Sequence, residues 1–321
     1  MEIVVVGARG FGQVHLNAIS GVDVSIVERD RAVAEEIRSK YGVRKVYSSF
    51  EEALNSDAEM IDLVVPHNLH REFAVKALRR GKHVLVEKPI ATTVREGEEM
   101  IAEAKRARKV LMVAEQYYFD TTVRYVMEQI RAGTVGTPKF ILVRDQRLFT
   151  RTGWRLFRSQ MGGGALIDGG IHYVDTMLNF GGDYTYVSAR SMNVAGIIEG
   201  EDTTVANLQF ANGSYGTLLY LWSYRDPPTL PAFEVIGTEG SIYEDPSTRK
   251  QGDFRSGRNY VYGDPVVNGK KVALEHADVF RAEMEAFFRA VREGTEPEMK
   301  PEVALRDLRC VLDIYRHAGV A

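Results

Sequence analysis

The sequence has almost no cysteine, no long apolar run and little net charge. Cys310 is the only cysteine in 321 residues, which excludes an internal disulfide. It falls in an apolar helical pattern with Leu308 and Val311, so we interpret it as a small core residue and not as a nucleophile. No run of about 18 apolar residues is present, so we expect no membrane partner. The formal net charge of −3 gives no electrostatic basis for binding nucleic acid.

A targeting segment is also missing. Met1 leads directly into the strand-like run Glu2–Val6, with no basic region or cleavage site. Together with the lone cysteine, this predicts a cytoplasmic location. A composition of 45% hydrophobic and 26% charged residues is ordinary for globular proteins, and the length predicts two domains.

Short apolar runs alternate with helical patterns over roughly the first 120 residues. The helical patterns cover Arg31–Tyr41 and Arg71–Gly81. This alternation predicts βαβ units, so we expect a Rossmann domain with a doubly wound parallel sheet over residues 1–119. The strand-like runs are Glu2–Val6, Val22–Val27, Leu63–Val65, His83–Val86 and Val110–Val113.

The second half of the chain has a different rhythm, in which β-rich runs follow one another with turn signals and no helices between them. We therefore expect an α+β domain over residues 120–321, with a large, mostly antiparallel open sheet. Three helical patterns accompany it, near Gly164–Phe180, Asp278–Arg292 and Pro301–His317. The runs are Lys139–Val143, Val187–Val194, Thr203–Phe210, Ser214–Trp222 and Phe233–Ile236.

A glycine-rich turn follows the first strand. A dinucleotide fingerprint has glycines at its first, third and sixth positions; Gly7 and Gly12 fit, but Arg9 occupies the third. Glu28 ends the second strand about 20 residues later, where a ribose-binding carboxylate belongs. This acid favours NAD, because it repels a 2′-phosphate. Arg29 keeps NADP open, since it can cover such a phosphate or simply be solvated.

Two further segments carry candidate catalytic groups. The fourth strand ends in Glu87-Lys88-Pro89, at the edge where parallel sheets bind ligands. In the pattern Gly162–Asp175, an α-helix would place Asp168, His172, Asp175 and Asn179 on one polar stripe. A carboxylate one turn from a histidine can orient it as an acid or base.

These segments together resemble the glucose–fructose oxidoreductase, inositol dehydrogenase and rhizopine catabolism (Gfo/Idh/MocA) family over essentially the whole chain. Arg9, His67 and the segment Gln116-Tyr117-Tyr118 depart from the usual family pattern, and the last of these points to a different substrate. The resemblance is carried by the glycine turn with His15 and by Pro66–His70, Gly81–Pro89, Gly162–Asp175, Phe233–Gly240 and Glu302–Tyr315.

The resemblance implies an NAD(P)-dependent oxidoreductase that transfers a hydride between the nicotinamide and a secondary hydroxyl of a sugar, cyclitol or sugar derivative. It implies Lys88, Asp168 and His172 as catalytic residues. We expect His172 to act as general base, Lys88 to polarise the substrate oxygen and Asp168 to orient the pair; the sequence leaves open whether Lys88 and His172 exchange roles.

The remaining expected contacts follow from the same segments. The expected cofactor-binding residues are Gly7, Arg9, Gly10, Phe11, Gly12, Glu28, Arg29, Pro66, His67, His70, Glu87 and Lys88. The expected substrate-binding residues are Tyr117, Tyr118, Trp154, Arg155, Asp168 and His172, with Asp175 as a further candidate. We expect no metal, because no carboxylate or cysteine cluster accompanies His67 and His70.

A run of arginines has two interpretations. It can form a solvated or inter-subunit face, or it can meet a phosphate or carboxylate on the substrate, as in a nucleotide sugar or a sugar acid. The run consists of Arg144, Arg147, Arg151, Arg155 and Arg158.

Other functions remain open on the same fold. They are an NAD-dependent redox glycosidase with permanently bound cofactor, a non-catalytic NAD(P)-binding regulator, and a reductase of C=N or C=C bonds. The resemblance also implies a homodimer or homotetramer formed through the C-terminal sheet.

Overall fold

The computed structural model describes residues 1–250 and 259–320, which form two compact units. Unit 1 comprises residues 1–115 and 280–305, and unit 2 comprises residues 116–250, 259–279 and 306–320. The sequence analysis placed the domain boundary after residue 119, and the N-terminal segment of unit 1 ends at residue 115. Residues 280–305, however, pack with unit 1, whereas the sequence pattern assigned them to the second domain.

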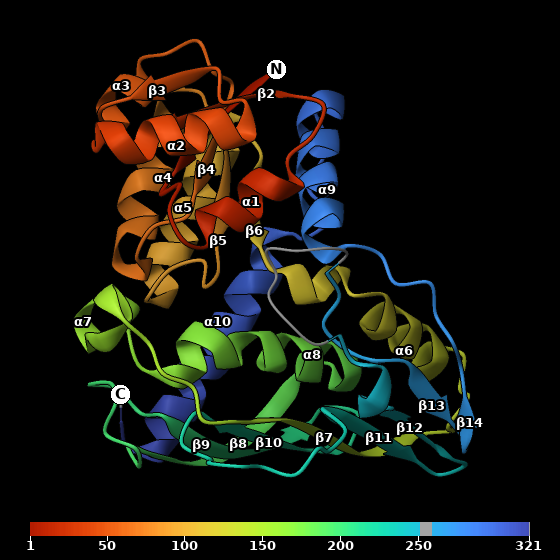
Figure 1. Cartoon of the computed structure of the whole chain (residues 1–321). Helices are drawn as coiled ribbons and strands as arrows, with labels where there is room; N and C mark the ends of the chain where they lie inside the picture. The colour runs from red at the N-terminus through yellow and green to blue at the C-terminus, as the bar shows by residue number, and fades with distance from the viewer. Residues whose placement is uncertain (251–258, 321) are drawn as a thin grey trace. The chain divides into compact units, whose positions relative to one another are not determined.

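Unit 1 is built on a six-stranded parallel sheet with strand order β3-β2-β1-β4-β5-β6. The order reverses between β1 and β4, which is the switch point where such sheets bind ligands. The doubly wound parallel sheet is therefore confirmed. The strands, from red to yellow in Figure 1, are β1 (Glu2–Val6), β2 (Asp23–Val27), β3 (Lys45–Tyr47), β4 (Met60–Leu63), β5 (His83–Glu87) and β6 (Leu111–Ala114).

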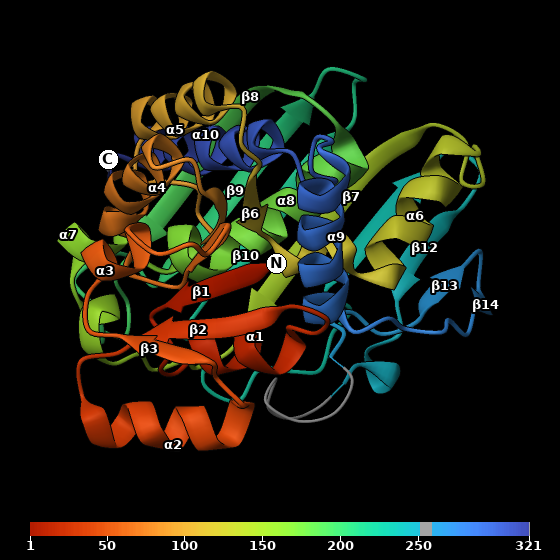
Figure 2. The same ribbon diagram turned by 90° about the horizontal axis from the view of Figure 1, so that it is seen from above.

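Helices cover both faces of this sheet, with α1 and α2 on one side and α4 and α5 on the other (Figure 2). The bounds predicted for α2 are confirmed because its ends carry clear signals: Asp30 accepts hydrogen bonds from the first amides, and Gly42 ends the helix at φ +65°. The helices are α1 (Gly12–Ala18), α2 (Arg31–Tyr41), α3 (Phe50–Leu54), α4 (His70–Arg79), α5 (Val94–Ala107) and, from Phe280 onward, α9 (Val279–Glu293), with a 3₁₀ turn η1 (His67–Leu69).

Unit 2 contains an eight-stranded sheet with order β14-β13-β12-β11-β7-β10-β9-β8. Its pairs are antiparallel except for β7 with β10, which run parallel. The expectation of a mostly antiparallel sheet is confirmed. The strands are β7 (Pro138–Gln146), β8 (Tyr184–Met192), β9 (Thr203–Phe210), β10 (Tyr215–Leu221), β11 (Phe233–Gly237), β12 (Ser241–Glu244), β13 (Pro265–Val267) and β14 (Lys270–Lys271).

Helices α6 and α8 lie on one face of this sheet (Figure 1). The opposite face exposes aromatic and aliphatic side chains. The sequence pattern missed α6, although Asp120 caps it and Val123 and Val126 bury its inner side. None of the helices among the described residues has the length and apolar character needed to cross a bilayer. The helices are α6 (Thr121–Arg131), α7 (Arg158–Met161), α8 (Ile171–Gly181) and the later part of α10 (Pro301–Ala318), with short turns at η2 (Gln116–Phe119), η3 (Gly153–Leu156) and η5 (Pro246–Thr248).

Candidate active site

Two positions of the glycine-rich turn after β1, Gly7 and Gly12, have room only for glycine. Gly7 has φ +95°, and an added Cβ would lie 2.0 Å from the carbonyl oxygen of Val64. At Gly12, where α1 begins, an added Cβ would lie 2.1 Å from the oxygen of Gly7. The turn therefore presents bare backbone at the switch point, which is the surface that a dinucleotide pyrophosphate needs.

Arg9, the residue that breaks the glycine fingerprint, is turned toward Glu28. Its Nε and NH2 atoms each lie 2.7 Å from a carboxylate oxygen of Glu28, so the pair is bidentate. The hydrogen bond from Arg9 lowers the pKa of Glu28, and the backbone amide of Asp30 adds to this effect. The carboxylate expected to bind ribose is thus ionised and held in place by the arginine, while Arg29 is exposed to solvent.

Behind the glycine turn lies a buried cluster that sequence reasoning did not identify. The ring of His15 is fully buried, with Nδ1 2.9 Å from Asp62 Oδ2 and Nε2 3.0 Å from Glu87 Oε1. Burial opposes its charge, but Asp62 and Glu87 outweigh burial and raise the pKa of His15. The carboxyl of Glu283, on α9, is also fully buried there, which raises its pKa. This cluster fixes Glu87, the residue immediately before Lys88.

The end of β5 carries Lys88, which is only 7% exposed, and the Lys88–Pro89 peptide bond is cis. His70 packs beneath this end, with Nδ1 2.8 Å from Pro89 O and Nε2 3.0 Å from Val65 O. Burial lowers the pKa of His70 to about 4, so the ring is neutral at physiological pH. A neutral ring has a single N–H, so it donates a hydrogen bond to one of these two carbonyl oxygens and lies between the ends of β4 and β5. His67 packs edge-on against this ring.

In unit 2, consecutive glycines precede the helix that carries Asp168 and His172. Gly162 ends α7 at φ +82°. An added Cβ at Gly163 would lie 2.6 Å from the hydroxyl of Tyr315, and one at Gly164 would lie 2.1 Å from the carbonyl oxygen of Glu201. The glycines are needed because two other segments approach the backbone closely here.

Tyr315 and Glu201 fasten this turn. The Tyr315 hydroxyl accepts hydrogen bonds from the amides of Gly164 and Ile167, both at 3.1 Å, and donates to Glu201 Oε1 at 2.8 Å. The same Oε1 accepts from the amide of Leu166 at 2.8 Å. Burial raises the pKa of Glu201 to about 7. The start of the helix is thus positioned by Tyr315 of α10 and by Glu201, which lies two residues before β9.

The helix itself differs from the continuous α-helix that we expected. Leu166–Gly170 is a π-helical turn, η4, and α8 begins at Ile171. An added Cβ at Gly169 would lie 2.1 Å from the hydroxyl of Tyr220, so that residue and its neighbour Gly170 let β10 pack against the turn. Wider turns of this kind occur frequently at functional sites.

The expected polar stripe is divided between two sets of partners. Asp168 is fully buried, with both carboxylate oxygens 3.1 Å from Arg155 Nε and Oδ2 3.1 Å from Arg151 NH2. Asp175 instead accepts a hydrogen bond from Asn179 at 2.9 Å and lies 3.2 Å from Arg306 of α10. We therefore interpret Asp175 as a residue that joins α8 to α10.

His172 is 7% exposed, and its ring stacks on Tyr117 with the centroids 4.3 Å apart and the planes 8° from parallel. Tyr117 is in turn held edge-on by Tyr173 and Tyr262. The imidazole plane is therefore fixed by an aromatic framework.

Of the other predicted substrate residues of unit 2, Arg155 binds Asp168, as described above. Tyr118 is partly exposed on η2, and the guanidinium of Arg155 lies 4.2 Å from the ring centre of Trp154. The sequence did not identify the residues that approach this helix from distant segments. Closely spaced glycines indicate that another segment packs against the backbone, but they do not show which residue it contributes. The approaching residues are Glu201, Tyr220, Arg306 and Tyr315. Within residues 1–250 and 259–320, no group of three or more metal-ligating side chains is placed to hold a metal ion.

Comparison with known proteins agrees with this geometry. A family model described as an oxidoreductase family with an NAD-binding Rossmann fold matches residues 1–115, and the model of the GFO/IDH/MocA C-terminal domain matches residues 123–243. The chain is 27% identical to 1,5-anhydro-D-fructose reductase of Ensifer adhaerens, covering 95% of this chain and 91% of that protein. It is 26% identical to myo-inositol 2-dehydrogenase of Thermotoga maritima, covering 94% and 91%.

The fold is shared with solved structures as well. An oxidoreductase of Thermotoga maritima superimposes with a TM-score of 0.86 at 26% identity, covering 100% of this chain and 97% of that one. Two family models thus account for most of the sequence, and both units have the architecture that those models describe. The chain belongs to the GFO/IDH/MocA family of oxidoreductases, with an NAD-binding Rossmann fold.

Proposed function

We propose that this protein is an NAD-dependent oxidoreductase that oxidises a secondary hydroxyl of a sugar, cyclitol or sugar derivative to a ketone, or catalyses the reverse reduction. The relatives named above act on an anhydro sugar and an inositol, which supports this substrate class. The observation that carries the proposal is His172, a nearly buried histidine with a fixed ring plane, four residues from a buried carboxylate. A proton acceptor of this kind suits an alcohol that loses its proton as its carbon is oxidised.

The residues of unit 1 fit a dinucleotide. Gly7 and Gly12 leave bare backbone for the pyrophosphate, and Glu28 is an ionised acceptor for the ribose hydroxyls. NAD, when bound, takes the hydride that leaves the substrate carbon. Glu28 favours NAD over NADP because its charge repels a 2′-phosphate, whereas Arg9 and Arg29 are the cations that would compensate for one.

The chain's own residues then accept the hydroxyl proton and stabilise the charge on the substrate oxygen. His172 takes the hydroxyl proton while Lys88 donates a hydrogen bond to the same oxygen and stabilises its developing negative charge. The electron pair left on oxygen forms the carbonyl bond as the C–H pair leaves. Asp168 keeps the arginines beside it in place and adds negative charge near the base.

The test is the absorbance of reduced nicotinamide, measured with NAD and with NADP against a panel of sugars, inositols, sugar acids and UDP-sugars. Lys88→Met and His172→Ala should each lower kcat by about 10² to 10⁴. Lys139→Met and His317→Ala are matched controls, because both residues are exposed. Near-native turnover in both site variants would refute the mechanism. A cofactor that binds but supports no turnover would favour the redox glycosidase or the regulator instead.

We also propose that the open face of the unit 2 sheet pairs with a second copy. Tyr186 and Tyr215 are 58% and 53% exposed, and Phe140 and Ile236 are exposed as well. Exposed apolar groups gathered on one face are typical of association surfaces. Light scattering should give the mass of a dimer or tetramer, and Tyr186→Lys with Tyr215→Lys should lower it; a monomeric parent protein would contradict the proposal.

A further inference from the structure

Three arginines of the segment that follows β7 gather at one place in unit 2. Arg151 and Arg155 both bind the buried carboxylate of Asp168, and the charge of Arg151 interacts with those of Arg155 and Arg147. The charge of Arg147 also interacts with Tyr117, the ring that stacks on His172. We call Arg147, Arg151 and Arg155 the arginine cluster. It lies within electrostatic reach of the groups that surround the proposed base.

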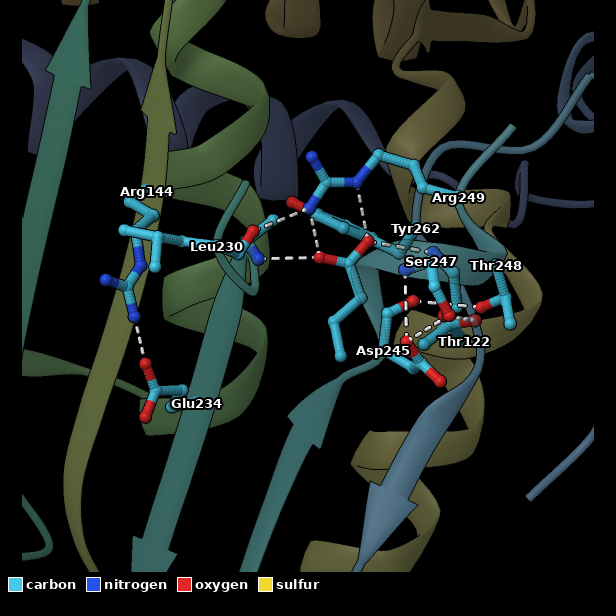
Figure 3. A network of polar contacts seen from close by, with 12 residues as sticks. Thr122, Arg144, Leu230, Glu234, Asp245, Ser247, Thr248, Arg249 and Tyr262 are labelled. Atoms are coloured by element: carbon cyan, nitrogen blue, oxygen red, sulfur yellow. Dashed lines mark hydrogen bonds and ion pairs between the residues drawn. The ribbon is translucent and has the colours of Figure 1, made fainter. Parts of the chain in front are cut away.

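Not every arginine of this stretch joins the cluster. Arg144 faces Glu234 on the neighbouring strand β11, as Figure 3 shows, and its charge is matched there. Arg158 donates a hydrogen bond to the backbone oxygen of Val320. The structure therefore separates the basic run into two residues with partners elsewhere and three that converge.

Aromatic rings hold each guanidinium of the arginine cluster. The guanidinium carbon of Arg147 lies 4.7 Å from the ring centre of Phe149, and that of Arg151 lies 4.1 Å from the same ring. Arg151 is also 4.8 Å from Trp222, as Arg155 is 4.2 Å from Trp154. A guanidinium on an aromatic face keeps its N–H edge available for planar, bidentate binding of an oxyanion. Arginines that only contact solvent do not need aromatic rings to hold their guanidinium groups.

The cluster also carries more positive than negative charge. Asp145 lies 2.9 Å from Arg147 Nε and Asp168 serves Arg151 and Arg155, so two carboxylates face three guanidiniums. Asp145 is in addition close to Arg249, which binds Glu244. Burial lowers the pKa of Arg151, and the neighbouring arginines lower it further, as expected where cations crowd together.

Donor groups remain for a ligand. A guanidinium has five N–H groups, and the side chains of Arg151 and Arg155 are 24% and 27% exposed. Nε of Arg151 is buried and, in the described part of the chain, has no hydrogen-bond partner. A buried donor of this kind has a free-energy cost that an anionic acceptor would remove.

We propose that the arginine cluster is a subsite for a carboxylate or phosphate group of the substrate, so that the enzyme acts on an anionic sugar derivative in preference to a neutral sugar. This inference rests on the proposed function, because it assigns the substrate of the same site. Arg147 and Arg151 bind the anion, Arg155 keeps Asp168 and Trp154 in place, and the hydroxyl to be oxidised then lies toward His172.

The experiment compares ligands that differ only in the anionic group: D-glucose with D-glucuronate and D-glucose 6-phosphate, and D-galactose with D-galacturonate. Binding is measured by calorimetry in the presence of NADH, and kcat/KM is measured with NAD. We expect at least one anionic member to bind at least tenfold more tightly than its neutral partner, and the preference to shrink as NaCl concentration rises. Comparison of D-glucuronate and D-galacturonate with D-glucose 6-phosphate identifies whether the cluster binds a carboxylate or a phosphate.

Arg147→Gln and Arg151→Gln should each reduce the preference for the anionic partner about tenfold or more, mainly through KM. Arg147 is about half exposed, so its variant also tests the cluster if Arg151→Gln does not fold. Arg158→Gln is the matched control and should keep the preference.

The results separate this inference from the proposed function. Turnover of neutral sugars with no preference for their anionic partners would overturn the inference and leave the proposed function in place. Tight binding of an anionic probe that is lost in Arg147→Gln, without turnover of any ligand, would support the subsite and contradict the oxidoreductase. If no anionic probe binds more tightly than D-glucose, the inference is wrong.

Discussion

Replacing Glu201 by glutamine should stabilise the protein at alkaline pH. Both hydrogen bonds from Leu166 and Tyr315 arrive on Oε1 of Glu201, so a glutamine with its carbonyl oxygen in that position keeps both. What the substitution removes is the ionisable proton of a buried acid. The fold around Gly164 has no need of the negative charge, since both partners are neutral donors.

The magnitude follows from the pKa of the carboxyl. Burial raises the pKa of Glu201 from the ordinary value of 4.5 to about 7. Below pH 4.5 the acid is protonated in both the folded and the unfolded chain, so its full contribution to stability is present. As pH rises toward 7 the unfolded chain loses the proton first, and the free energy of unfolding falls by about 3 kcal/mol. Glutamine carries no such penalty.

The assay is chemical denaturation of the parent protein and Glu201→Gln, followed by circular dichroism at pH 5 and pH 8. The variant should be more stable by about 3 kcal/mol at pH 8 and by about 1 kcal/mol at pH 5. Glu285→Gln, at an exposed position on α9, is the control and should show no such trend. A difference that does not depend on pH, or a variant less stable than its parent at pH 8, would refute the reasoning.

Two other substitutions test close contacts in the site. Glu28→Ala frees Arg9 for a 2′-phosphate, so the ratio of kcat/KM for NADP over NAD should rise about 10- to 100-fold; an unchanged ratio would mean that Arg9 does not reach the cofactor. Gly169→Ala places a Cβ 2.1 Å from the hydroxyl of Tyr220 and should lower the free energy of unfolding by about 1–3 kcal/mol, with a fall in kcat. Tyr220→Phe in the same chain should recover part of the stability measured in urea, and no recovery would contradict the steric explanation.

Local sequence patterns predicted those helices and strands whose start and end are marked by residues within or next to the element itself. The helix Arg31–Tyr41 and the strand Thr203–Phe210 have the predicted bounds. Capping residues mark the ends of the helix, and the turn sequence Ala211-Asn212-Gly213 follows the strand. The three-residue strand β3 and the two-residue strand β14 are too short to show a period. The position of α9 in unit 1 depends on contacts such as that of Phe280 with Phe11, which no local pattern contains.

In the candidate site, too, local motifs could be predicted from the sequence and contacts from distant segments could not. Lys88, Asp168 and His172 stand in recognisable motifs, so the sequence identified them as candidates without showing their surroundings. The sequence could not show that Asp168 is held by Arg151, since a guanidinium 17 positions earlier has no fixed spatial relation to it outside a regular element. Nor could it predict the π-turn, where Tyr220 of the distant strand β10 packs against Gly169.

The contact between Gly164 and Tyr315 joins residues 151 positions apart. A newly made chain therefore carries Asp168 and His172 long before the tyrosine that fastens their helix has been synthesised. Contacts of such large sequence separation form late, because a long loop must close before they contribute free energy. The glycine turn at Gly7 packs on Val64, but Phe11 and His15 beside it also meet Phe280 and Glu283 of α9. In the order of synthesis, both units therefore wait for the C-terminal part of the chain before their packing is complete.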